Sequence, residues 1–135
     1  MHQFSTEELY VITTHWLSDI TFFEQEIQYF QSLITRYFLP NVEDEYVMII
    51  KSLQGQLQRL DATKSKLRDI IILHQNKLSS LLDKSHLDSE AYFNVQHTDF
   101  EAQLFDFIRN LRQVKLEFFN ATKFSGQLKS RPYNG

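Results

Sequence analysis

The chain has 135 residues and a net charge of −3, and 42% of its residues are hydrophobic, which is typical of one globular domain with a buried core. The absence of cysteine excludes disulfides, thiol nucleophiles and thiolate metal sites. The lack of a basic tract argues against a nucleic-acid partner, and the scarcity of turn residues, with three Gly and two Pro, argues against an all-β fold.

The first predicted helix spans residues 6–38. Ser5 begins a capping-box sequence in which its hydroxyl can accept from an early backbone N–H while Glu8 reaches back to Ser5. Pro40 is expected to end the helix, because the residue before a proline is pushed out of the helical region. The buried seam alternates steps of four and three residues, as in a heptad: Leu9, Thr13, Trp16, Ile20, Phe23, Ile27, Phe30, Ile34 and Tyr37.

The second predicted helix spans residues 43–83. Asn41 is the expected cap, followed by acidic residues that suit the positive end of the helix dipole. Gly55 falls at an outward position, where it costs roughly 1 kcal/mol relative to Ala without breaking the helix. The seam contains two polar members, Lys64 and His74: Tyr46, Ile50, Leu53, Leu57, Leu60, Lys64, Leu67, Ile71, His74, Leu78 and Leu81.

The third predicted helix spans residues 89–125. A polar turn before it offers Ser85 or Asp88 as caps, and Gly126 is a natural stop. Its seam reads Phe93, His97, Phe100, Leu104, Phe107, Leu111, Val114, Phe118 and Ala121.

Short connections between long helices force sequential neighbours to lie antiparallel. The sequence therefore predicts an all-α fold: one antiparallel up-down-up three-helix bundle over residues 1–126, with coiled-coil-like packing, and a flexible tail at 127–135. Folding the helices back at the two turns places His74 opposite His97 and Leu78 opposite Phe93. It also places Leu9 beside His74, and Trp16 beside Leu67.

The two seam histidines are the best candidates for a site. His97 and Glu101 share one helical face, so His74, His97 and Glu101 form the candidate metal ligands. The alternative is a pair of semi-buried imidazoles, hydrogen-bonded to each other or to Tyr10 and Thr13. A zinc site usually takes three or four protein ligands, and the two Glu-x-x-His motifs of a di-iron bundle are absent from the sequence.

Lys64 is the other polar seam member. Its ammonium must reach solvent or pair with an anion, and Asp19 and Asp106 lie at about its height. A packed stem with a partnered or solvated charge is favoured over a nucleophilic lysine, which needs a pocket and a second catalytic group. No nucleophile elbow or phosphate-binding glycine loop is found, so no catalytic residue and no cofactor is predicted.

Some apolar residues lie outside the three seams. Ile72, Phe105 and Phe119 point away from the expected bundle centre and are candidate interface residues. A contiguous exposed apolar patch is a contact surface, so we expect a homodimer or a partner helix. The alternative is that these side chains are scattered singly, which is normal for a protein surface.

The stretch "HWLSDITFFEQEIQYFQSLITRYF" resembles the first helix of short, uncharacterised all-helical proteins of Bacteroidetes-type bacteria. That resemblance implies two more long helices and supplies no activity. Since no window is long and apolar enough to span a membrane and the N-terminus has no secretory pattern, a cytoplasmic location is expected. The expected function is that of a non-enzymatic interaction or scaffold bundle; the alternative is a small metal-binding bundle, in the style of hemerythrin-like or ferritin-like proteins.

Overall fold

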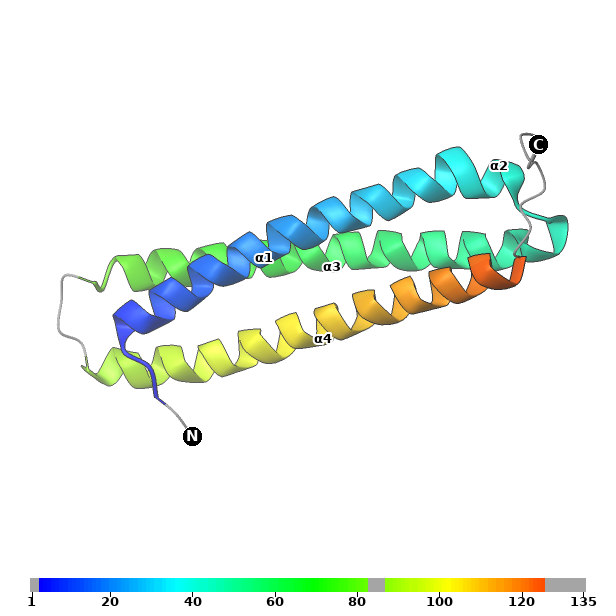
Figure 1. Cartoon of the computed structure of the whole chain (residues 1–135). Coiled ribbons are helices and arrows are strands. Elements are labelled where there is room, and N and C mark those ends of the chain that lie inside the picture. Colours follow the sequence, from blue (N-terminus) through cyan, green and yellow to red (C-terminus); the bar gives the residue numbers. More distant parts are fainter. Residues whose placement is uncertain (1–2, 83–86, 126–135) are drawn as a thin grey trace. The chain divides into compact units, whose positions relative to one another are not determined.

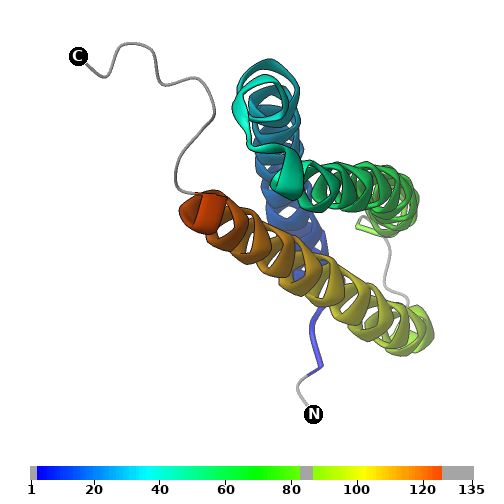
Figure 2. The same cartoon turned by 90° about the vertical axis from the view of Figure 1, so that its right-hand side faces the viewer.

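The computed structural model describes residues 3–82 and 87–125, and over these residues the protein is all-α. Three long helices pack together: α1 (Thr6–Leu33), α3 (Val47–Ser79) and α4 (Leu87–Ser125). Each helix runs in the direction opposite to the one before it, which Figures 1 and 2 show from two sides. The predicted all-α three-helix bundle is therefore confirmed.

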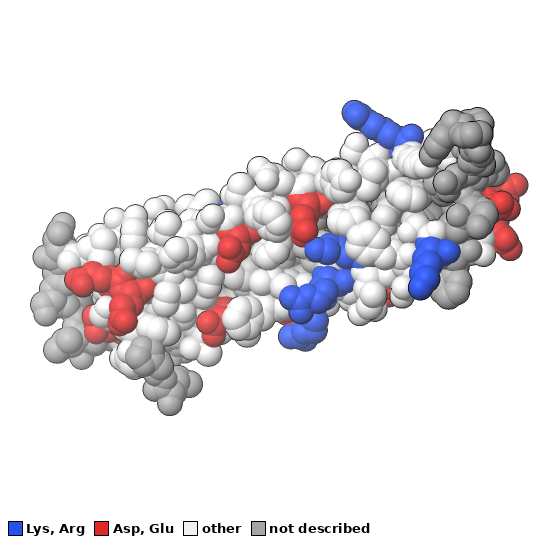
Figure 3. Space-filling view, viewed as in Figure 1, with Lys and Arg blue, Asp and Glu red and all other residues white. Residues whose placement is uncertain are grey.

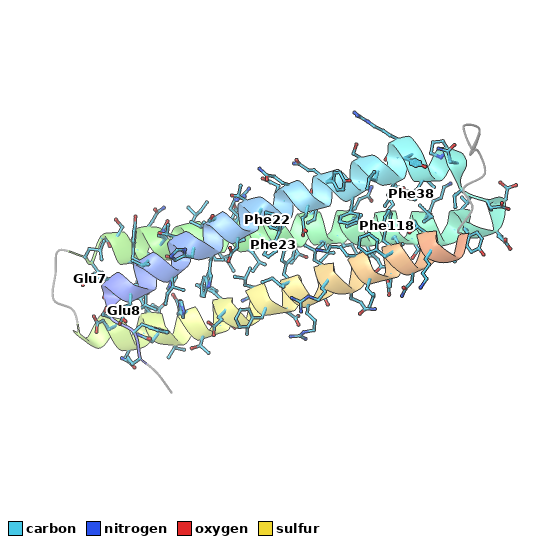
Figure 4. All side chains as sticks on the ribbon, in the orientation of Figure 1. Glu7, Glu8, Phe22, Phe23, Phe38 and Phe118 are labelled. Carbon is cyan, nitrogen blue, oxygen red and sulfur yellow. The ribbon has the colours of Figure 1, made fainter. Side chains whose placement is uncertain are left out.

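The start of α1 is fixed by the predicted capping box. The backbone N–H of Glu8 donates to Ser5 Oγ at 3.1 Å, and the backbone N–H of Ser5 donates to Glu8 Oε1 at 2.9 Å. Two N–H groups at the helix start thereby gain partners, which is what the sequence pattern predicts. Glu8 is labelled at the start of α1 in Figure 4.

The end of the first helical segment differs from the prediction, because the chain stays helical through Pro40. A π-helical turn, η1 (Ile34–Phe38), leads into α2 (Leu39–Asn41). The N–H of Leu39 donates to the carbonyl of Ile34, five residues back. In a regular α-helix a proline ring clashes with the carbonyl four residues earlier. The wider π turn relieves that clash, so Pro40 does not end the helix.

The turn that follows is consequently later than expected. Val42 is extended, with φ −80° and ψ 151°, and the chain re-enters helix through the 3₁₀ turn η2 (Asp44–Tyr46). The prediction that Asn41 caps the second helix is wrong: Asn41 is the last residue of α2, and its Nδ2 donates to the carbonyl of Tyr37 at 2.7 Å. Asp88 lies within α4, whereas Ser85, Gly126 and the predicted tail lie outside the described residues.

The chain divides into two compact units, and α1, α3 and α4 each contribute one segment to both. The first unit comprises Met1–Phe23 and Thr63–Phe107, and the second comprises Glu24–Ala62 and Ile108–Gly135. In both units the buried residues are those of the three heptad seams, with Val42 as an addition. The seam pattern therefore predicted the core almost residue by residue.

The register between α3 and α4 in the first unit is as predicted. Leu78 and Phe93 share a buried cluster, and the rings of His74 and His97 face each other with centroids 6.5 Å apart. The register of α1 is not: Leu9 packs with Leu78 and Phe93 rather than beside His74, and Trp16 stacks on His97. Leu78 lies four residues beyond His74, and His74, which His97 faces, lies seven residues beyond Leu67, so α1 is displaced by between one and two helical turns. This displacement follows from the later turn, since helix continues to Asn41.

Candidate functional site: a buried polar layer and an exposed apolar surface

Two buried imidazoles form the most unusual feature of the first unit. His74, on α3, is 1% exposed and His97, on α4, is 2% exposed. None of their four ring nitrogens has a hydrogen-bond partner. A buried polar group without a partner costs free energy, and most such groups in folded proteins are paired. The heptad pattern placed both residues in the core because a seam position is buried whatever residue occupies it.

Aromatic rings surround the two imidazoles. Trp16 of α1 stacks on His97, with centroids 4.3 Å apart and planes inclined by 18°. Phe4 meets His97 edge-on at 5.5 Å, and His74 lies 5.0 Å from Phe100 and 5.7 Å from Phe93. These rings contribute apolar surface and no hydrogen-bond acceptor to the imidazole nitrogens. The layer is polar at its centre and apolar around it.

The predicted hydrogen bonds between the imidazoles, Tyr10 and Thr13 do not form. The hydroxyl of Thr13 donates to the carbonyl of Tyr10 at 2.8 Å, within its own helix, and accepts from Gln75 Nε2 at 3.3 Å. Neither hydrogen bond involves His74 or His97. The displaced register of α1 brings Trp16, rather than Tyr10, against His97.

Burial controls the charge state of the layer. Desolvation lowers the pKa of His74 from its ordinary value to about 4; the nearby His97 and Lys77 act in the same direction, and the Gln96 side chain opposes them. Desolvation also lowers the pKa of His97, although the carboxylate of Glu101 partly offsets this. Both imidazoles are therefore neutral near pH 7.

The structure does not assemble the predicted metal ligands. In the described part of the chain no three His, Asp or Glu side chains are grouped so that they could hold a metal ion, and this includes His74, His97 and Glu101. Only two possible donors, the imidazoles of His74 and His97, lie close together, whereas structural zinc takes four protein ligands and catalytic zinc takes three. Glu101 lies at the edge of the seam and is only partly buried, which is why it acts on His97 electrostatically rather than as a ligand partner.

Lys64 is buried as the seam predicts, with 4% of its surface exposed. Lys64 has an interaction partner, and so does Asp106, which the predicted register places at the same level along the bundle. This agrees with the structural interpretation of Lys64 as a packed stem with a partnered charge.

The three candidate interface residues are exposed. Ile72 is 40% exposed, and Phe105 and Phe119 are each 54% exposed. They are members of a larger set of exposed apolar side chains. In the described residues this set also contains Val11, Phe22, Tyr29, Met48, Ile49, Leu73, Tyr92, Val95 and Leu116.

Sequence reasoning missed a clamp between the N-terminal segment and α4. Asn94 Nδ2 donates to the carbonyl of Phe4, and the N–H of Phe4 donates back to Asn94 Oδ1, both at 2.8 Å. Glu90 Oε2 accepts from the backbone and hydroxyl of Thr6 at 3.2 Å. The clamp holds Phe4 over His97. Helical periodicity carries no signal for it, since Glu90 and Asn94 flank the seam rather than occupy it.

Comparison with protein-family models, curated proteins and solved structures finds no match to this chain. Among the described residues, no helix is sufficiently long and apolar to cross a membrane.

Proposed function

We propose that the protein is a non-enzymatic helical bundle that acts as an interaction or scaffold module and associates with a second copy of itself. The observation that carries this proposal is the set of large apolar side chains that remain exposed, including Ile72, Phe105 and Phe119. Moving apolar surface out of water is favourable. Burying phenylalanines that are more than half exposed would therefore drive association with another protein surface.

The buried layer supports the same proposal by its chemistry. A catalytic site needs polar groups that can reach a substrate, and His74 and His97 are enclosed by Trp16, Phe4 and Phe100. The chemically interesting side chains are thus inside, while the outer surface offers apolar contacts. A cytoplasmic location, expected from the sequence, belongs to this proposal.

Sedimentation velocity of the full chain over a range of concentrations tests the proposal. We expect the weight-average mass to rise from that of a monomer toward that of a dimer as concentration increases. The Phe105→Ser/Phe119→Ser variant should stay monomeric at concentrations where the unmodified chain is dimeric.

Phe22→Ser is the matched control, because Phe22 on α1 is 57% exposed, close to the 54% of Phe105 and Phe119 on α4. It should dimerise like the unmodified chain. A chain that remains monomeric at every concentration, up to several hundred micromolar, would overturn the proposed self-association.

A further inference from the structure

Among the described residues, α4 has five exposed large apolar side chains; four of them lie within about 120° of one another around the helix, and the fifth, Tyr92, lies outside this arc. Phe105, Leu116 and Phe119 are separated by 11 and 3 residues, which are close to whole numbers of helical turns. At 100° per residue, Val95, which is 72% exposed, falls on the same side. The core-facing seam uses a different side, through residues such as Leu111. We call Val95, Phe105, Leu116 and Phe119 the α4 stripe.

The charges of α4 are divided sharply along its length. Residues 87–107 contain five acidic residues and neither Lys nor Arg: Asp88, Glu90, Asp99, Glu101 and Asp106. Residues 108–125 contain four basic residues and one acidic residue: Arg109, Arg112, Lys115, Lys123 and Glu117. Figure 3 shows basic side chains gathered over the middle and later part of α4. Along α4, the first half of the α4 stripe therefore lies in an acidic segment and its second half lies in a basic segment.

The same division extends to the two units as wholes. The first unit has ten acidic and five basic residues, and the second has seven acidic and nine basic residues. Within the second unit, Lys115 is already paired with Glu26, with Nζ 3.0 Å from Oε2. Arg112 and Lys123 are exposed on α4 and are available to a partner of opposite charge.

These features select one arrangement of two copies. In a parallel pairing of α4 helices, acidic halves would meet acidic halves and basic halves would meet basic halves, which is repulsive. In an antiparallel pairing around a two-fold axis, the acidic half of each α4 meets the basic half of the other, and the exposed apolar residues contact the partner on the same side of the helix. Building on the self-association proposed above, we propose that the occupant of the α4 stripe is a second copy of this chain, with its α4 antiparallel.

Charge reversal tests the arrangement. Asp99→Lys/Glu101→Lys makes the first half of α4 less acidic, and Arg112→Glu/Lys123→Glu makes the second half acidic. Each variant alone should dimerise about tenfold or more weakly than the unmodified chain, since two like-charge contacts per half replace attractive ones on both sides of the two-fold axis. Sedimentation velocity provides the measurement, and far-UV circular dichroism confirms that each variant keeps its helix content.

The decisive experiment combines the two sets of charge-reversing substitutions, either by mixing the two variants or by placing all four substitutions in one chain. An equimolar mixture of the two variants should form a heterodimer, and a chain carrying all four substitutions should regain self-association, because both combinations restore opposite charges across the interface. Added salt should weaken the unmodified dimer by screening the same contacts.

The outcomes separate the two proposals. If the unmodified chain stays monomeric, both fall. If it dimerises but the reversed variants dimerise equally well, or if their mixture and the fourfold variant fail to recover association, the antiparallel α4 arrangement is overturned while self-association stands.

Discussion

The two units bury equivalent heptad positions with opposite chemistry. In the first unit the seams bring together His74 and His97, whose nitrogens lack partners. In the second they bring together Phe30 and Phe118, and Phe38, which flanks the seam, joins them. Phe118 is edge-on to Phe30 at 5.2 Å and to Phe38 at 5.0 Å, and Figure 4 labels Phe38 and Phe118. The aromatic layer gains stability from apolar burial at any pH. The histidine layer loses stability in acid, because burial disfavours the protonated imidazoles.

The largest expected change in stability comes from a substitution that disrupts the aromatic layer. Phe118 is 2% exposed, so Phe118→Ala removes most of a ring from the core and leaves a cavity. We expect the free energy of unfolding to fall by about 3–5 kcal/mol. Urea unfolding followed by circular dichroism at pH 7, at a concentration where the chain is monomeric, measures the change.

Phe22→Ala is the matched control for this substitution. Phe22 is 57% exposed and contacts the neighbouring Phe23, so its loss should cost no more than about 1 kcal/mol. Equal losses for Phe118→Ala and Phe22→Ala would show that Phe118 does not hold the buried position described for it.

The second prediction concerns acid. Above pH 6.5 His74 is neutral in both the folded and the unfolded chain. As the pH falls below 6.5, the unfolded chain binds a proton that folded His74, with a pKa of about 4, does not bind, so stability decreases until about pH 4. This group alone accounts for a loss of about 3 kcal/mol, since one pKa unit corresponds to 1.36 kcal/mol. Urea unfolding at half-unit intervals between pH 7 and 4 follows it.

The double variant His74→Leu/His97→Leu isolates this contribution from that of carboxylates, which also titrate in acid. It should show a shallower loss of stability between pH 6.5 and 4. At pH 7 it should be more stable than the unmodified chain by about 1–2 kcal/mol, because four unpartnered nitrogens leave the core. A pH dependence identical to that of the unmodified chain would contradict the burial of the imidazoles as neutral groups.

The contrast also shows which parts of the structure could be predicted from sequence. The heptad spacing identified the buried positions, because burial depends on which side of a helix a residue occupies. It could not identify their partners. Pro40 was expected to end the first helix. The π turn before it instead moved the fold-back point, so the register of α1 changed and Trp16 reached His97. Such a local rearrangement has no periodic signature.

In the candidate site, too, the buried positions were predictable from sequence, whereas some of their partners were not. The facing of His74 and His97 depended only on the α3–α4 turn, where the predicted register holds. Their lack of hydrogen bonds depended on α1, where the register differs, so the expected bonds to Tyr10 and Thr13 were wrong. The exposure of Phe105 and Phe119 was predictable, because an outward helical position needs no knowledge of the neighbouring helices.

The smallest expected change in stability comes from a substitution in the second unit that leaves the histidine layer unchanged. Gly55 lies within α3, and a Cβ added there would meet only the flexible end of Arg59, at an ordinary 3.8 Å. Gly55→Ala should therefore raise the free energy of unfolding by about 0.5–1 kcal/mol, through the lower conformational freedom of alanine in the unfolded chain. Because the substitution leaves His74 and His97 unchanged, the gain should be the same at pH 7 and pH 5. A gain that disappears at pH 5 would mean that the acid response is not confined to the first unit, and the contrast between the two layers would have to be abandoned.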